Sequence, residues 1–259
     1  MHPIQSEVLK SYLQGYFTSL AFLSRLPIPL SWQSSRSEDF ARVPHYFWLA
    51  GLTLSFVVAL AGLLGVILLP DSVAMACLVG FQVLLTGAFH EDGLADLADS
   101  VGANTRERRF EIMADSRLGT FGVSALVVLF LIRWTAYRDL LAEGSLWRWM
   151  LLITLVGGWG RWVSVAVLKM LPYVHRKGKG IGQGFDVPGW REIVITAGVL
   201  IIMTALGNPS WMIPIIAAVG LTLGLSKVLF PRWLGGVNGD CLGAACVFSE
   251  MLMLIFVCV

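Results

Sequence analysis

Long apolar runs recur along this 259-residue chain, and they constrain its fold more than any other feature. A helix that crosses the hydrocarbon core of a membrane needs about 20 mostly apolar residues, and most of the runs reach that length. Backbone polar groups find no water in lipid, so repeated runs of this kind favour a bundle of helices. We therefore predict an all-α, polytopic membrane protein with about seven spanning helices, forming a single domain over residues 1–259. The runs cover residues 46–69, 73–89, 119–137, 146–171, 193–206, 211–230 and 241–259.

The opening segment is less regular. Residues 12–23 are too short an apolar stretch to span, so we expect them to lie in the membrane interface or to re-enter it. No basic-led apolar stretch with a small-residue cleavage site opens the chain, so a cleaved signal peptide is not expected. With 56% hydrophobic residues, the composition itself argues against a soluble domain.

Basic residues are distributed unevenly over the segments that join the apolar runs. If the spans alternate in direction, all 19 Lys and Arg residues except Arg133, Arg138, Arg148 and Arg161 fall on one side. Lys and Arg accumulate in short cytoplasmic loops. The distribution therefore predicts that the N-terminus is cytoplasmic.

Residues 90–99 (HEDGLADLAD) concentrate carboxylates in a chain of which only 14% is charged. In a helix, Asp92, Asp96 and Asp99 lie at i, i+4 and i+7 and share one face. No Lys or Arg offsets their repulsion within the stretch, so a dication with oxygen ligands, such as Mg²⁺, would stabilise it. A solvated acidic helix end is the alternative. His90 begins this stretch and is either a participant in proton transfer or a hydrogen-bonded bystander.

Two further segments could contact an anionic substrate. Residues 175–184 (HRKGKGIGQG) place Lys177 and Lys179 among glycines, and such a backbone can approach phosphate or pyrophosphate closely. An ordinary positive-inside loop is the alternative. Arg117 lies two residues after Asp115, so a metal and an arginine could hold an anionic group side by side.

Isolated polar residues also occur at the edge of the spans or inside them. Residues 235–245 (GGVNGDCLGAA) place Asn238 and Asp240 where glycine-rich chain meets the last span, although Asp240 could simply cap that helix. Arg161 and Glu250 lie within spans, where a central charge costs about 2.5–3.5 kcal/mol on insertion scales. They either pair with each other or face a polar cavity, and a purely structural role is the alternative.

The predicted orientation brings the unusual polar segments to the same side of the membrane. These are residues 25–29, 90–122, 175–184 and 235–240. Their co-location predicts one active site at the cytoplasmic mouth of a helix bundle. A transporter would instead tend to show broken helices in two matching halves, and no internal repeat is evident.

The chain resembles the cobalamin synthase family of adenosylcobinamide-GDP ribazoletransferases from near its N-terminus to its last span. Gly160-Arg161 and Glu250 belong to the matching set, and none of the departures from the family pattern, such as Leu97 and Ser100, removes a carboxylate. The longer segments that carry the resemblance are residues 22–29 (FLSRLPIP), 87–99 (GAFHEDGLADLAD), 111–122 (EIMADSRLGTFG) and 235–245.

The resemblance implies the last assembly step of the nucleotide loop of adenosylcobalamin. In that reaction α-ribazole, or its 5′-phosphate, joins the phosphate of adenosylcobinamide-GDP, and GMP is released. The reaction is Mg²⁺-dependent and takes place at the bacterial inner membrane, with the active site on the cytoplasmic side. The expected partners are these two substrates and membrane lipids, with no nucleic acid, and the sequence leaves a homo-oligomer open.

The resemblance also suggests roles for individual residues. We expect the aspartates of residues 90–99 to hold Mg²⁺ on the pyrophosphate, with Asp115 or Asp240 completing the site or accepting the ribose hydroxyl proton. The residues expected to contact metal or act in catalysis are Asp92, Asp96, Asp99, Asp115 and His90. Those expected to bind substrate are Arg25, Arg117, Arg161, Lys177, Lys179, Asn238 and Asp240.

Two other classes of protein would use similar residues. A CDP-alcohol phosphotransferase needs DGxxAR followed by GxxxDxxxD, whereas Asp96 stands here where that signature continues with Ala-Arg. A cation transporter needs carboxylates near the bilayer midplane, whereas residues 90–99 lie at the predicted end of a span. Release of GMP from a cobinamide-GDP donor distinguishes all three.

Overall fold

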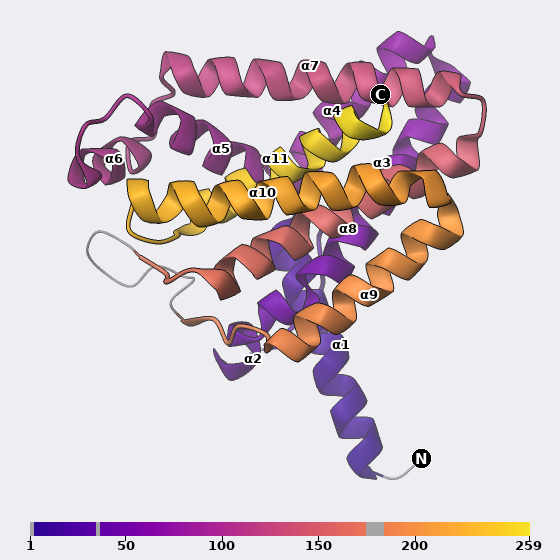
Figure 1. Ribbon diagram of the computed structural model, residues 1–259. Helices are drawn as coiled ribbons and strands as arrows, with labels where there is room; N and C mark the ends of the chain where they lie inside the picture. The colour runs from indigo at the N-terminus through magenta and orange to yellow at the C-terminus, as the bar shows by residue number, and fades with distance from the viewer. Residues whose placement is uncertain (1–2, 35–36, 175–183) are drawn as a thin grey trace.

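The computed structural model describes residues 3–34, 37–174 and 184–259 (Figure 1). Apart from one isolated bridge between Tyr173 and Val237, regular structure in these ranges is helical, which confirms the all-α prediction. The α-helices are α1 (Pro3–Leu23), α2 (Ser37–Ala41), α3 (Phe47–Leu68), α4 (Asp71–Thr86), α5 (Phe89–Ser100), α6 (Arg106–Met113), α7 (Thr120–Ala142), α8 (Leu146–Met170), α9 (Trp190–Gly207), α10 (Met212–Trp233) and α11 (Gly239–Val257).

Six of the described helices are long and apolar enough to cross a membrane: α3, α7, α8, α9, α10 and α11. The pair α4 and α5 counts as a seventh only if it is one broken span, because the two helices meet at 92°. The prediction of about seven spans is therefore confirmed. Which side of the membrane the N-terminus occupies stays a prediction.

Helix α8 forms the centre of the bundle and packs against α3, α9, α10 and α11. Small residues let these helices approach, as is common between membrane helices. A Cβ atom at Gly157 of α8 would overlap the side chain of Ser55 in α3, and one at Gly160 would lie 2.7 Å from the Glu250 carboxylate of α11. The glycines of α8 therefore bring α3 and α11 to its surface.

The corner between α4 and α5 determines where the acidic segment lies. Gly87 and Ala88 both adopt left-handed conformations, with φ of 64° and 59°, and this ends α4 and redirects the chain. The side chain of Arg25 packs against the bare face of Gly87, and its backbone N–H donates to the Leu85 carbonyl at 2.7 Å. Residues just after α1 therefore brace the corner that aims α5.

One end of the bundle gathers the polar segments. In Figure 1 the ends of α8 and α10 and the starts of α7 and α11 point to the same end of the bundle, at the left of the view, where α6 also lies. The Val237 N–H donates to the Pro172 carbonyl at 2.9 Å, and the Val174 N–H donates to the Val237 carbonyl at 2.7 Å. Of the segments predicted to share one side of the membrane, residues 90–122 and 235–240 meet in space, since Gly93 lies against Asp240 and Arg106 against Gly235.

Candidate active site

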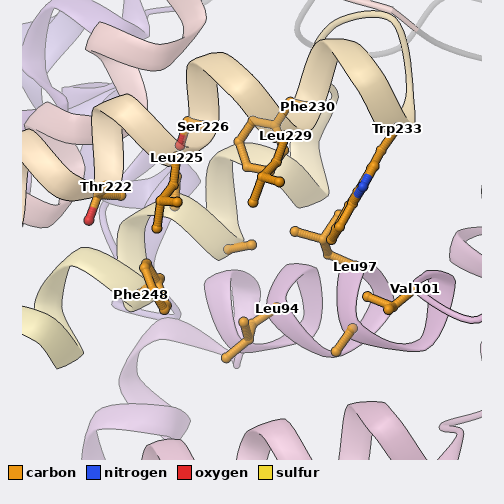
Figure 2. Close-up of a pocket in the computed structure, with 13 residues that line it drawn as sticks. Leu94, Leu97, Val101, Thr222, Leu225, Ser226, Leu229, Phe230, Trp233 and Phe248 are labelled. Atoms are coloured by element: carbon orange, nitrogen blue, oxygen red, sulfur yellow. The ribbon is translucent and has the colours of Figure 1, made fainter.

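Helix α5 presents two different faces. Leu94, Leu97 and Val101 follow at i, i+3 and i+7 and face α10 and α11 across an apolar groove of about 200 Å³ (Figure 2). Asp92, Asp96 and Asp99 lie on the other face, so the predicted acidic stripe is a real helical stripe. The residues of α10 that line the groove include Leu225, Leu229, Phe230 and Trp233.

Close packing of α5 on the start of α11 adds a fourth carboxylate. A Cβ atom at Gly93 would lie 2.8 Å from the backbone carbonyl of Asp240, and one at Gly243 would lie 3.2 Å from the backbone of His90. Glycine at position 93 is required for this approach, and glycine at position 243 eases it. The contact places Asp240 next to the acidic face of α5.

Three carboxylates gather at this crossing. Asp96 is half-buried and interacts electrostatically with Asp92, Asp240 and Asp99, most strongly with Asp92. Asp240 also interacts with Asp92. None of these four aspartates, Asp99 included, has a salt-bridge partner in the described part of the chain. We call Asp92, Asp96 and Asp240 the carboxylate cluster.

The start of α11 is capped by Asn238 and not by Asp240. The Asn238 side-chain oxygen accepts from the Cys241 N–H at 3.0 Å, as an N-cap residue does. Its amide nitrogen donates to Asp240 Oδ2 at 2.8 Å. Capping therefore does not account for Asp240, and Asn238, predicted to bind substrate, uses its side chain to cap the helix and orient this carboxylate.

Asp99 has a different environment from its neighbours on the stripe. Its two carboxylate oxygens accept the N–H groups of Gly119 and Gly122, each at 2.7 Å. A Cβ atom at either glycine would overlap the carboxylate. Asp99 thus caps the N-terminus of α7 from another helix, where the helix dipole favours a negative charge. Asp99 therefore has a structural role at the start of α7, and its metal role stays a prediction.

Asp115 and Arg117 bind each other in an exposed loop. The Arg117 guanidinium donates to both Asp115 oxygens, the shortest contact being 2.6 Å. These hydrogen bonds lower the pKa of Asp115 to about 2. No interaction joins Asp115 to the carboxylate cluster in the described residues, so the structure does not bring this predicted metal ligand to the site.

Arg161 is also placed differently from its predicted substrate-binding role. It is 2% exposed and donates to Glu250, which confirms the predicted pairing of these residues. Arg133 of α7 donates to Glu91 at 2.6 Å and to Glu250 at 2.8 Å. We call Glu91, Arg133, Arg161 and Glu250 the buried charge network. It joins α5, α7, α8 and α11.

Half of this network was not predicted from the sequence. The distribution of basic residues predicts that Arg133 lies on the far side of the membrane, whereas the structure buries that side chain inside the bundle. No role was predicted for Glu91, although helix geometry already places it on a different side of α5 from the aspartates. An isolated Arg within an apolar run was the available signal, because such a charge requires a buried partner.

Several cations lie around the same end of the molecule. Arg25 is exposed at the α4–α5 corner, and the guanidinium of Arg106 packs on Gly235 in the loop before α11. Arg109 donates to the Trp233 carbonyl at 3.2 Å and so fixes α6 to the end of α10. Lys177 and Lys179, predicted to contact phosphate, lie outside the described residues.

The carboxylate cluster fits a cation that substrate helps to bind. Within the described ranges no group of three or more His, Cys, Asp or Glu side chains could hold a metal ion by itself. Mg²⁺ does not need such a group, since it commonly takes one or two carboxylates and completes its shell with water and substrate phosphates. Asp92, Asp96 and Asp240 provide such oxygen ligands and have no competing basic partner in the described part of the chain.

Fold and site together define a class of protein. This is a polytopic helical membrane protein whose carboxylates, contributed by two helices, gather at one end beside arginines. The arrangement is suited to metal-assisted transfer of an anionic group.

Comparison with known proteins identifies the family. The model of the family described as cobalamin-5-phosphate synthase matches residues 15–258. This chain is 33%, 36% and 36% identical to curated adenosylcobinamide-GDP ribazoletransferases of Vibrio parahaemolyticus, Vibrio cholerae and Citrobacter koseri, respectively. These matches cover 95%, 95% and 93% of this chain and 92%, 94% and 97% of the relatives. No solved structure matches the chain. The chain belongs to the cobalamin-5-phosphate synthase family, which confirms the resemblance.

Proposed function

We propose that this chain joins adenosylcobinamide-GDP to α-ribazole, or to α-ribazole 5′-phosphate, in a Mg²⁺-dependent reaction. The products are GMP and adenosylcobalamin, or adenosylcobalamin 5′-phosphate. Relatives that carry the name of this transferase match nearly the whole chain. The observation that carries the proposal is the meeting of Asp240 with Asp92 and Asp96 at the Gly93 contact, since a pyrophosphate donor requires neutralisation of its charge.

Each residue of the site has a separate role in the proposed transfer. The acceptor hydroxyl oxygen forms a bond to the phosphorus next to cobinamide, and the P–O bond to GMP breaks. We assign Asp92 and Asp96 to Mg²⁺, which when bound neutralises charge on the pyrophosphate. Asp240, held by the Asn238 amide, accepts the hydroxyl proton. Arg25 and Arg106 are placed to contact phosphate oxygens. Contact of Lys177 and Lys179 with phosphate is proposed from the sequence alone.

The proposal includes the cellular location. Basic residues predominate on the side of the chain that contains the carboxylate cluster. By the positive-inside rule this side faces the cytoplasm, and the relatives are bacterial proteins, so we propose an inner-membrane enzyme with a cytoplasmic active site. Its surroundings are lipids, and nucleic acid has no part in the reaction.

GMP release by the purified protein in detergent tests the proposal. We expect release only when adenosylcobinamide-GDP, a ribazole acceptor and Mg²⁺ are all present. Asp96→Asn and Asp240→Asn should each lower kcat by about 100-fold or more, while the protein still inserts and purifies normally. Asp115→Asn is the matched control and should keep near-normal kcat. Near-normal activity of Asp96→Asn would refute the metal role, and GMP release without an acceptor would refute the transfer.

A further inference from the structure

An aromatic cavity of about 330 Å³ adjoins the carboxylate cluster. Phenylalanines from four separate parts of the chain form its apolar lining: Phe22 of α1, Phe47 of α3, Phe89 of α5 and Phe185. The Phe22 ring centre lies 5.9 Å from that of Phe47, 5.3 Å from that of Phe89 and 5.9 Å from that of Phe185. These aromatic rings enclose a space beside the site where transfer is proposed.

The rest of the lining is mixed, and it includes one residue with a buried atom that has no partner in the described ranges. Tyr173, Leu242, Gly239 and Gly243 lie there beside the polar side chains of His90, Ser164, Asn238 and Asp240. Asp240 belongs both to this lining and to the carboxylate cluster, so the cavity reaches the proposed proton acceptor. The Ser164 hydroxyl is satisfied because it donates to the Leu242 carbonyl at 2.9 Å. His90 is only 4% exposed, and its Nδ1 atom is buried without a hydrogen-bond partner in the described ranges. His90 lines the cavity, and a bound ligand toward which its imidazole turns would supply the missing partner.

We propose that the aromatic cavity binds the planar base of the ribazole acceptor, with the ribose directed toward Asp240. The base packs between the phenylalanine rings, and Nδ1–H of His90 donates to the free nitrogen of the base. This inference rests on the proposed function and adds to it the site of the acceptor. It gives His90 a binding role in place of proton transfer.

The chemistry of the lining distinguishes the acceptor base from guanine, the other planar group in the reaction. Guanine carries several donors and acceptors, and each one buried without a partner lowers affinity. Phenylalanine rings satisfy none of them, and the Asn238 side chain in the lining is already bonded to Asp240 and to the Cys241 N–H. A benzimidazole-type base attached to ribose has one free ring nitrogen, which matches the single unpaired atom of His90. The volume is at the lower end for ligand pockets, which suits a base and excludes a corrin ring.

Steady-state kinetics of the purified full-length protein test the aromatic wall. Phe185→Ala should raise the KM for α-ribazole by roughly tenfold and leave the KM for adenosylcobinamide-GDP unchanged. Phe40→Ala is the matched control, because Phe40 packs on Phe22 and Phe185 but does not line the cavity. Phe185→Leu replaces Phe185→Ala if the latter does not fold. Acceptors with an apolar benzimidazole base should also have a lower KM than those with adenine.

A pair of substitutions tests the hydrogen bond. The amide nitrogen of Asn occupies about the position of His Nδ1, whereas that of Gln reaches the position of Nε2. His90→Asn should therefore keep the KM for the acceptor within about threefold, and His90→Gln should raise it roughly tenfold. A structural or acid–base role would instead change kcat in both variants.

The outcomes separate this inference from the proposed function. If Phe185→Ala raises the KM for the donor and weakens inhibition by GMP, the cavity binds guanine and the inference is wrong. Unchanged KM values for both substrates would show that the aromatic residues only pack the core, which also overturns it. If the wild-type protein releases no GMP, the proposed function fails. Equilibrium dialysis of α-ribazole against wild-type and Phe185→Ala protein then decides the inference alone, since equal binding or none overturns it.

Discussion

The buried charge network gives a sharp prediction about stability. Its four side chains are 1–4% exposed, and its two carboxylates balance its two guanidinium groups. Arg133 is the only member that contacts both Glu91 and Glu250. Arg133→Met therefore leaves Glu91 without its partner and gives the network a net negative charge inside the bundle.

The expected cost follows from the burial of these groups. Removing one partner of a buried ion pair destabilises a protein by about 3–5 kcal/mol, because the remaining charge is left desolvated. For a chain of this size that corresponds to a fall in melting temperature of about 6–20 °C. Replacing both partners should cost much less. The variant Glu91→Leu with Arg133→Met keeps the neutral Glu250–Arg161 pair and buries only apolar groups in place of the other two.

Thermal unfolding in detergent, followed by size-exclusion chromatography, measures these differences. We expect the double variant to melt above Arg133→Met, with a coupling energy of about 1–3 kcal/mol between the two sites. Additive losses, or a single variant as stable as the wild type, would refute the reasoning. In that case charge balance would not hold the four helices together.

Three other substitutions test single features of the site. Gly93→Ala should separate α5 from α11, costing about 1–3 kcal/mol and most GMP release, whereas Gly80→Ala, which meets no neighbouring atom, should leave both unchanged. Asp99→Ala should lower stability by about 0.5–2 kcal/mol through loss of the cap on α7, and unaltered melting would contradict that role. Arg117 lowers the pKa of Asp115 to about 2, so the contribution of this ion pair to stability is complete above the unfolded pKa and is lost only as pH falls through about 2. Because Asp115 does not titrate at higher pH, Asp115→Asn should leave the pH–rate profile unchanged between about pH 5 and 9.

Part of the candidate site was predictable because it depends on one helix. The spacing of Asp92, Asp96 and Asp99 shows that they share a face, since helix geometry alone places residues four apart side by side. The same pattern could not reveal that Asp99 binds backbone N–H groups of α7 while Asp96 has no such partner. That distinction depends on which helix packs where, and the glycines that permit the packing look alike in a sequence.

The sequence alone is enough to predict a helical membrane protein with about seven spans and to indicate the family to which it belongs. These conclusions follow from local properties: the length of apolar runs, the period of a helix and the order of family motifs. The sequence does not show the break between α4 and α5, which meet at 92°. The tertiary structure decided the grouping of charges. It brought Asp240 to the acidic face of α5, paired Asp115 with Arg117 outside the cluster, and buried Arg133 and Arg161 with Glu91 and Glu250. The physical reason is that electrostatic partners are chosen by distance in space, and in a bundle that distance is fixed by contacts between helices far apart in the chain.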